Sequence, residues 1–77
     1  MKFEPTAKNL ALRKYQEIYT SNYRLYCQKS LNAWKDGRES GAYAICKAIG
    51  VTKEEISRIR EIARKIVDYE LEKKMQA

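Results

Sequence analysis

A short segment that begins at Gly50, with the sequence GVTKEEI, constrains the fold of this chain more than any other. Thr52 and Glu55 have the spacing of a capping box. In that motif the threonine hydroxyl accepts from the glutamate backbone N–H, and the carboxylate accepts from the threonine backbone N–H. Val51 and Ile56 have the spacing of a hydrophobic staple around this box. Because glycine readily adopts the left-handed backbone that ends a helix, the segment predicts two helices meeting at a tight corner around Gly50.

Residues 42–61 place small and branched apolar side chains on both sides of that corner. Cys46 lies four positions before the glycine, and the aliphatic residues around the corner are Ile45, Ile49, Val51, Ile56 and Ile59. In this spacing the segment resembles the helix-turn-helix unit of DNA-binding proteins. There a small residue lets two helices cross closely, and aliphatic side chains fill the wedge between them. The same residues also suit a purely structural corner, because a fold does not by itself decide function.

The resemblance implies which side chains would contact double-stranded DNA, since a recognition helix presents its first turns to the major groove. These positions are Thr52, Lys53, Ser57, Arg58, Arg60 and Arg64. The hydroxyls and the basic groups would contact phosphates or base edges, with the last two arginines on the flank. Glu54 and Glu61 oppose this role, because a polyanion repels carboxylates. The alternative is a solvated helix face held by ion pairs four residues apart.

The composition argues against most catalytic and metal chemistry. The chain has no histidine, no glycine-rich phosphate loop and two cysteines, Cys27 and Cys46, which both fall within apolar helical patterns. We therefore expect no enzyme activity, no catalytic residue, no metal site and no cofactor. Both thiols are expected to be reduced and buried in a cytoplasmic protein. No stretch approaches the roughly 18 apolar residues of a membrane span.

The length of the chain indicates a single domain over residues 1–77. A core of this size is only marginally stable alone, so a homodimer is expected. The net charge of +6 favours the approach of nucleic acid, although many small proteins have a similar charge.

Hydrophobic periodicity predicts an all-α fold with a long N-terminal helix and a C-terminal helix-turn-helix corner. The expected helices cover residues 7–35, 40–49 and 53–72. Gly37 is the expected end signal of the first helix, and Ser40 is the expected cap of the second. A break at residues 20–22, which would give a four-helix domain, is the main alternative, because Thr, Ser and Asn have weak helix propensity.

Aromatic side chains follow one face of the first expected helix. They are Tyr15, Tyr19, Tyr23, Tyr26 and, two turns further on, Trp34. Rings with a polar hydroxyl suit the edge of a small core. They equally suit an interface with a second subunit or a protein partner, where Tyr and Trp are enriched. Stacking on the bases of single-stranded nucleic acid is a third possibility.

Together these patterns favour a small DNA-binding protein of the helix-turn-helix type. The leading hypothesis is a dimeric transcriptional or replication regulator of a bacterium, plasmid or phage. The alternative is a non-enzymatic protein-interaction module, for example a phage or host adaptor or inhibitor. Such a module would bind through the tyrosine-rich face, and its corner would be structural.

Overall fold

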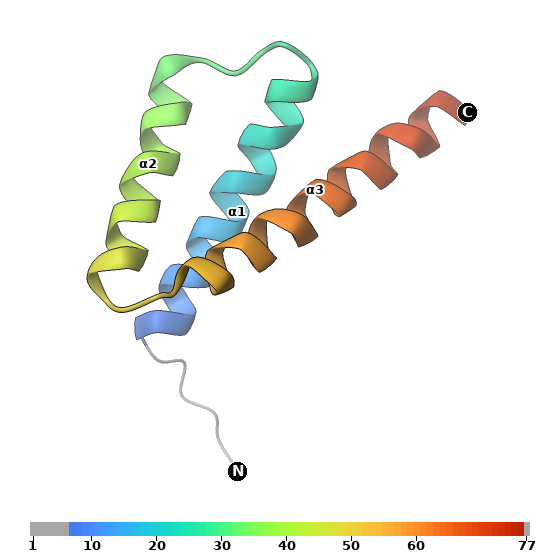
Figure 1. Cartoon of the computed structure of the whole chain (residues 1–77). Coiled ribbons are helices and arrows are strands. Elements are labelled where there is room, and N and C mark those ends of the chain that lie inside the picture. Colours follow the sequence, from blue (N-terminus) through green and yellow to red (C-terminus); the bar gives the residue numbers. More distant parts are fainter. Residues whose placement is uncertain (1–6, 77) are drawn as a thin grey trace.

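The computed structural model describes residues 7–76, which form three helices (Figure 1). They are α1 (Ala7–Cys27), α2 (Ala33–Ala48) and α3 (Lys53–Gln76). The described residues contain no strand, so the predicted all-α fold is confirmed. α2 folds back antiparallel to α1, whereas α3 crosses α1 at a slant and its C-terminal turns project beyond the other two helices (Figure 1). None of the described helices combines the length and apolar character needed to cross a membrane.

The first helix is shorter than predicted, because the expected helix over residues 7–35 ends at Cys27. Lys29 adopts a left-handed backbone with a φ of 58°. The backbone N–H of Ser30 then donates to the Leu25 carbonyl at 2.8 Å, as in a Schellman-type helix end. Asn32 caps α2, and its side chain accepts from the Lys35 N–H at 2.9 Å. The helix thus stops without the glycine that usually occupies such a position.

Two further expectations about this half of the chain are wrong, whereas the expected continuity of the helix through residues 20–22 is confirmed. Gly37 and Ser40 are neither an end signal nor a cap, since both lie inside α2. The alternative break at residues 20–22 is also absent, because α1 continues through it. There the Thr20 hydroxyl donates to the Gln16 carbonyl at 2.7 Å, which satisfies the side chain within the helix. A fourth helix is not found among residues 7–76.

The corner at Gly50 has the local geometry that its sequence predicts. Gly50 has a φ of +92°, and the backbone N–H of Val51 donates to the Cys46 carbonyl at 2.9 Å. The Thr52 N–H donates to the Glu55 carboxylate at 3.0 Å, and the Glu55 N–H donates to the Thr52 hydroxyl at 3.2 Å. The capping box is therefore complete, and α3 starts at Lys53 as expected.

The packing around the corner differs from that of the helix-turn-helix resemblance. The backbone of α1 lies close to both α2 and α3, whereas the backbones of α2 and α3 do not approach each other closely. The space between them is occupied by Tyr15 of α1, which is fully buried with Cys46, Val51 and Ile56. Cys46 directs its thiol to the Ala11 carbonyl in α1 at 3.5 Å, so this small residue allows a close approach to α1. The close crossing of α2 and α3 is not confirmed.

The core is small for a chain of this length. Its buried hydrophobic residues are Tyr15, Ala42, Cys46, Val51, Ile56, Ala63 and Val67. Ile45 and Ile49, which were expected to face inward, are 59% and 40% exposed. Cys27 was also expected to be buried but is exposed. Considerable apolar surface therefore lies outside the core of the described residues.

Candidate functional site

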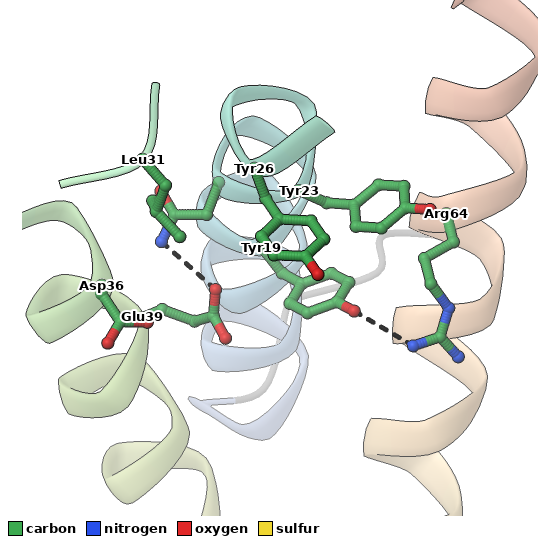
Figure 2. Close-up of a pocket in the computed structure, with 8 residues that line it drawn as sticks. Tyr19, Tyr23, Tyr26, Leu31, Asp36, Glu39 and Arg64 are labelled. Carbon is green, nitrogen blue, oxygen red and sulfur yellow. Dashed lines mark hydrogen bonds between the residues drawn. The ribbon is translucent and has the colours of Figure 1, made fainter. Parts of the chain in front are cut away.

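An open groove of about 300 Å³ lies over α1 between α2 and the middle of α3 (Figure 2). Its floor is formed by Tyr19, Tyr23 and Tyr26 of α1, as Figure 2 shows. The remaining lining residues are Asn22, Leu31, Asp36, Glu39 and Arg64. The groove exists because α2 and α3 both pack on α1 but diverge from each other. We call it the tyrosine groove.

The tyrosine rings are stacked along α1, because residues three or four positions apart lie on one face of a helix. The centroids of Tyr15 and Tyr19 are 5.9 Å apart, and those of Tyr19 and Tyr23 are 6.3 Å apart with an interplanar angle of 11°. Tyr23 and Tyr26 continue the stack at 6.3 Å. Exposure increases along the stack, from complete burial of Tyr15 to 65% exposure of Tyr26.

Three tyrosine hydroxyls are paired with polar side chains of α3 in a regular ladder. Arg60 Nε donates to the Tyr15 hydroxyl at 2.7 Å, and Arg64 donates to the Tyr19 hydroxyl at 3.2 Å (Figure 2). The Tyr23 hydroxyl donates to the Asp68 carboxylate at 3.2 Å. Each pair is separated by 45 residues, so both helices advance by one turn from each pair to the next. We call these contacts the tyrosine ladder.

Burial and neighbouring side chains shift the pKa values of two of these phenols, Tyr15 and Tyr23. Burial raises the pKa of Tyr15, and the hydrogen bond from Arg60 opposes this shift. The Cys27 thiol, partial burial and the Asp68 carboxylate together raise the pKa of Tyr23 to about 12. The hydrogen bond with Tyr15 in turn raises the pKa of Arg60. At neutral pH the Tyr23 phenol in the floor of the groove is therefore uncharged.

The wall of the groove formed by α2 is acidic. Asn22 of α1, buried under this wall, donates to the Lys35 carbonyl at 2.8 Å and to the Glu39 carboxylate at 3.2 Å. Asp36 lies one turn earlier on α2 and is exposed. Arg64 is the cation on the opposite wall, as Figure 2 shows. The groove thus combines an apolar aromatic floor with two carboxylates on one side and a guanidinium on the other.

The side chains predicted to contact DNA are divided between two environments. Thr52, which precedes α3, and Lys53, Ser57 and Arg58 in its first turns are exposed, as a DNA-reading surface requires. Arg60 is directed inward: its guanidinium lies 5.4–5.9 Å from the centroids of three tyrosine rings. Its place in the ladder leaves Arg60 poorly placed to contact phosphate.

Other features of this surface also make it less suited to contact phosphates. Glu54 and Glu61 are exposed on α3, and the Glu61 carboxylate is 3.4 Å from the Lys65 ammonium. Arg64 is exposed, but it is held by the Tyr19 hydroxyl. The predicted DNA-binding set is therefore not brought together as one basic surface.

The residues predicted to form an interface are also divided. Tyr15 belongs to the core, Tyr19 and Tyr23 are half-buried in the groove, and Tyr26 is exposed at its open end. Trp34 is 68% exposed on α2, where it lies under the Arg38 guanidinium at 5.3 Å, and does not line the groove. The stripe does not continue to Trp34, because α1 ends at Cys27.

The structure also adds residues that the sequence analysis missed. Asp36 and Glu39 in the acidic wall and Asp68 in the ladder were not selected as candidates. The repeated four-residue spacing of tyrosines in α1 and of polar residues in α3 was the available signal. No group of three metal-binding side chains is present among the residues that the structure describes. Comparisons with known protein families, curated proteins and solved structures found no match.

Proposed function

We propose that this chain is a small, non-enzymatic protein-binding domain that binds a partner through the tyrosine groove. The observation that carries the proposal is the open end of the tyrosine stack. Tyr26 presents a ring that is 65% exposed, while the rings beneath it are fixed by stacking and by the ladder. A preorganised aromatic surface binds with little loss of side-chain entropy, which is why such residues carry much of the energy of protein interfaces.

The charges of the groove define the chemistry of the partner. Asp36 and Glu39 line one wall, and Arg64 lines the other. A helical or extended segment with one apolar or aromatic side chain, flanked by a lysine or arginine, would satisfy the floor and the acidic wall together. Because both Cys27 and Cys46 are unpaired, a reducing compartment such as the cytoplasm suits the domain.

Selection of a displayed random-peptide library on the immobilised protein tests this proposal. Peptides that the wild type retains should bind at least roughly tenfold more weakly to Tyr26→Ser, because most of the accessible ring is removed. Trp34→Ser is the matched control, since it removes an equally exposed aromatic ring outside the groove. Equal loss in both variants, or selected peptides without an apolar anchor, would contradict binding in the groove.

DNA binding is a second candidate, supported by the exposure of Lys53, Ser57 and Arg58 on a chain with a net charge of +6. Retention on duplex DNA at two salt concentrations tests it. If DNA binds at this surface, Lys53→Ala and Arg58→Ala should weaken retention and reduce its salt dependence. Absence of retention at low salt would leave the protein-binding function alone.

A further inference from the structure

A row of exposed apolar side chains follows α3 on a face that α1 does not cover. Ile62, Ile66 and Tyr69 are 41%, 43% and 59% exposed. Ile62 and Ile66 each precede a buried core position, Ala63 and Val67, so they are rotated by about 100° from the face that packs on α1. Since the backbone of α2 does not approach α3 closely either, no described helix covers this row.

The row has the spacing of a helix-pairing seam. Starting from the half-buried Ile59, the apolar positions follow at steps of three, four and three residues. One further step of four residues leads from Ile59 back to Glu55, and another leads from Tyr69 on to Lys73. Alternating steps of three and four keep side chains on the face that a neighbouring helix contacts. We call these six positions the α3 seam, which is roughly 27 Å long at 1.5 Å per residue.

The charges of the seam match those of a second copy in reverse orientation. In this arrangement the second α3 runs antiparallel to the first, and the midpoints between Ile62 and Ile66 of the two helices coincide. Ile62 of one copy then faces Ile66 of the other, and Ile59 faces Tyr69. The same alignment places Glu55, whose carboxylate also lies 3.1 Å from the Lys8 ammonium of its own chain, opposite Lys73 of the second copy at both ends. A parallel alignment would instead bring glutamate to glutamate and lysine to lysine, which is unfavourable. The acidic first turn and basic last turn of α3 support the reversed orientation.

The flank of the seam shows the same complementarity. Arg58 and Glu72 each lie one residue before a seam position, and the reversed alignment places them opposite each other across the two helices. Lys65 occupies the centre of this flank, where it would meet its own counterpart. Its ammonium lies 3.4 Å from the Glu61 carboxylate in the same chain, which reduces that repulsion.

We propose that two copies of this chain form an antiparallel dimer through their α3 seams. The inference does not rest on the proposed function, because Arg64 and Asp68 of the tyrosine ladder lie on roughly the opposite side of α3 from Ile62 and Ile66. The dimer therefore leaves both tyrosine grooves open and presents them in a symmetric pair. It also covers the exposed Tyr69 in the C-terminal half of α3, whose last turns project beyond α1 and α2 (Figure 1).

Sedimentation equilibrium of the full chain measures the self-association directly. The wild type should form a concentration-dependent dimer. Ile66→Glu should weaken the dimer affinity at least roughly tenfold, because Ile62 of each copy loses its apolar partner in the other copy. Ile45→Glu is the matched control: it places the same charge on an exposed isoleucine of α2 and should leave the mass unchanged. Circular dichroism of each variant establishes that the helices are retained.

Charge exchange tests the orientation even if Ile66→Glu fails to fold. Arg58→Glu and Glu72→Arg should each weaken the dimer, and the double variant should restore it, since only the reversed alignment brings these positions together. A monomer at every concentration, or a dimer lost with Ile45→Glu but retained with Ile66→Glu, would overturn the proposal. Failure of the double variant to restore the dimer would overturn the antiparallel orientation.

Discussion

Arg60→Ala tests whether this arginine holds the fold together or serves a surface that binds nucleic acid. In the structure its Nε donates to the hydroxyl of the fully buried Tyr15 at 2.7 Å. Its guanidinium also lies within 5.9 Å of the ring centroids of Tyr15, Tyr19 and Tyr43. Among the described residues, every buried side-chain nitrogen or oxygen has a hydrogen-bond partner. The substitution would remove the partner of a phenol that water does not reach.

The expected cost follows from these contacts. Leaving a buried hydroxyl without a partner costs about 1–3 kcal/mol. Loss of cation–π contacts at a half-buried site adds on the order of 1 kcal/mol. A net destabilisation of about 3 kcal/mol is therefore expected, a large fraction of the roughly 5–15 kcal/mol that stabilises a typical domain. For a domain of this size it corresponds to a decrease in Tm of roughly 12–24 °C.

Urea denaturation followed by circular dichroism measures this cost, and a double-mutant cycle with Tyr15→Phe assigns it. On the Tyr15→Phe background no hydroxyl is left unpaired, so Arg60→Ala should cost at least about 1 kcal/mol less than in the wild type. Lys53→Ala, at an exposed position of the same helix outside the α3 seam, should change stability by less than about 0.5 kcal/mol. Equal effects of Lys53→Ala and Arg60→Ala, or purely additive effects in the cycle, would refute the structural role of Arg60.

Three further expectations concern the corner, the thiols and the cap of α3. Gly50→Ala should destabilise the fold by about 1–2 kcal/mol, because its φ is +92°, whereas Gly37→Ala inside α2 should stabilise it by about 0.5–1 kcal/mol in urea denaturation. Ellman's reagent should modify the exposed Cys27 rapidly and Cys46 only on unfolding, since Cys46 is buried and burial raises its pKa. The Thr52 backbone N–H and the Lys8 ammonium lower the pKa of Glu55, so its stabilisation is present above the ordinary carboxyl pKa. That stabilisation is lost as the pH falls through the lowered value, and the Tm values of wild type and Glu55→Gln should converge in acid.

The corner at Gly50 was predictable because its determinants are local. The glycine, the capping box and the staple lie within seven consecutive residues, and each satisfies a backbone requirement at its own position. The residues that end α1 are also close together in the sequence, but their sequence pattern indicates a helix end less clearly. Lys29 adopts a left-handed backbone that glycine would normally supply, while Gly37, the more obvious end signal, lies within α2. Sequence patterns reflect the conformation that each residue type usually adopts, so they did not predict the left-handed backbone of Lys29.

The candidate site depends on contacts between distant residues, which explains why only part of it was predicted. The tyrosine stripe was predictable from the spacing of tyrosines within one helix. In the structure Tyr15, Tyr19, Tyr23 and Tyr26 all lie in α1, whereas Trp34 lies in α2. The partners of the stripe follow only from the relative placement of α1 and α3, which sets the constant separation of 45 residues. Without that placement, Arg60 and Arg64 resemble free cations at the edge of a DNA-binding helix. Because of the ladder, we expect Arg60 to stabilise the fold, and Arg64 lines the wall of the groove.

Considerable apolar surface lies outside the core, but much of it is on α3 rather than on the tyrosine face predicted to form an interface. Three tyrosines of α1 are satisfied by α3 through the ladder, which leaves Tyr26 as the exposed ring of the stack. The C-terminal half of α3 supplies Ile62, Ile66 and Tyr69 to the surface instead. Loss of a dimer with Ile66→Glu, but not with Tyr26→Ser, would assign self-association to α3 and leave the groove to a different partner. A dimer lost with Tyr26→Ser but retained with Ile66→Glu would instead place self-association at the tyrosine groove. There would then be no reason to propose two separate binding surfaces.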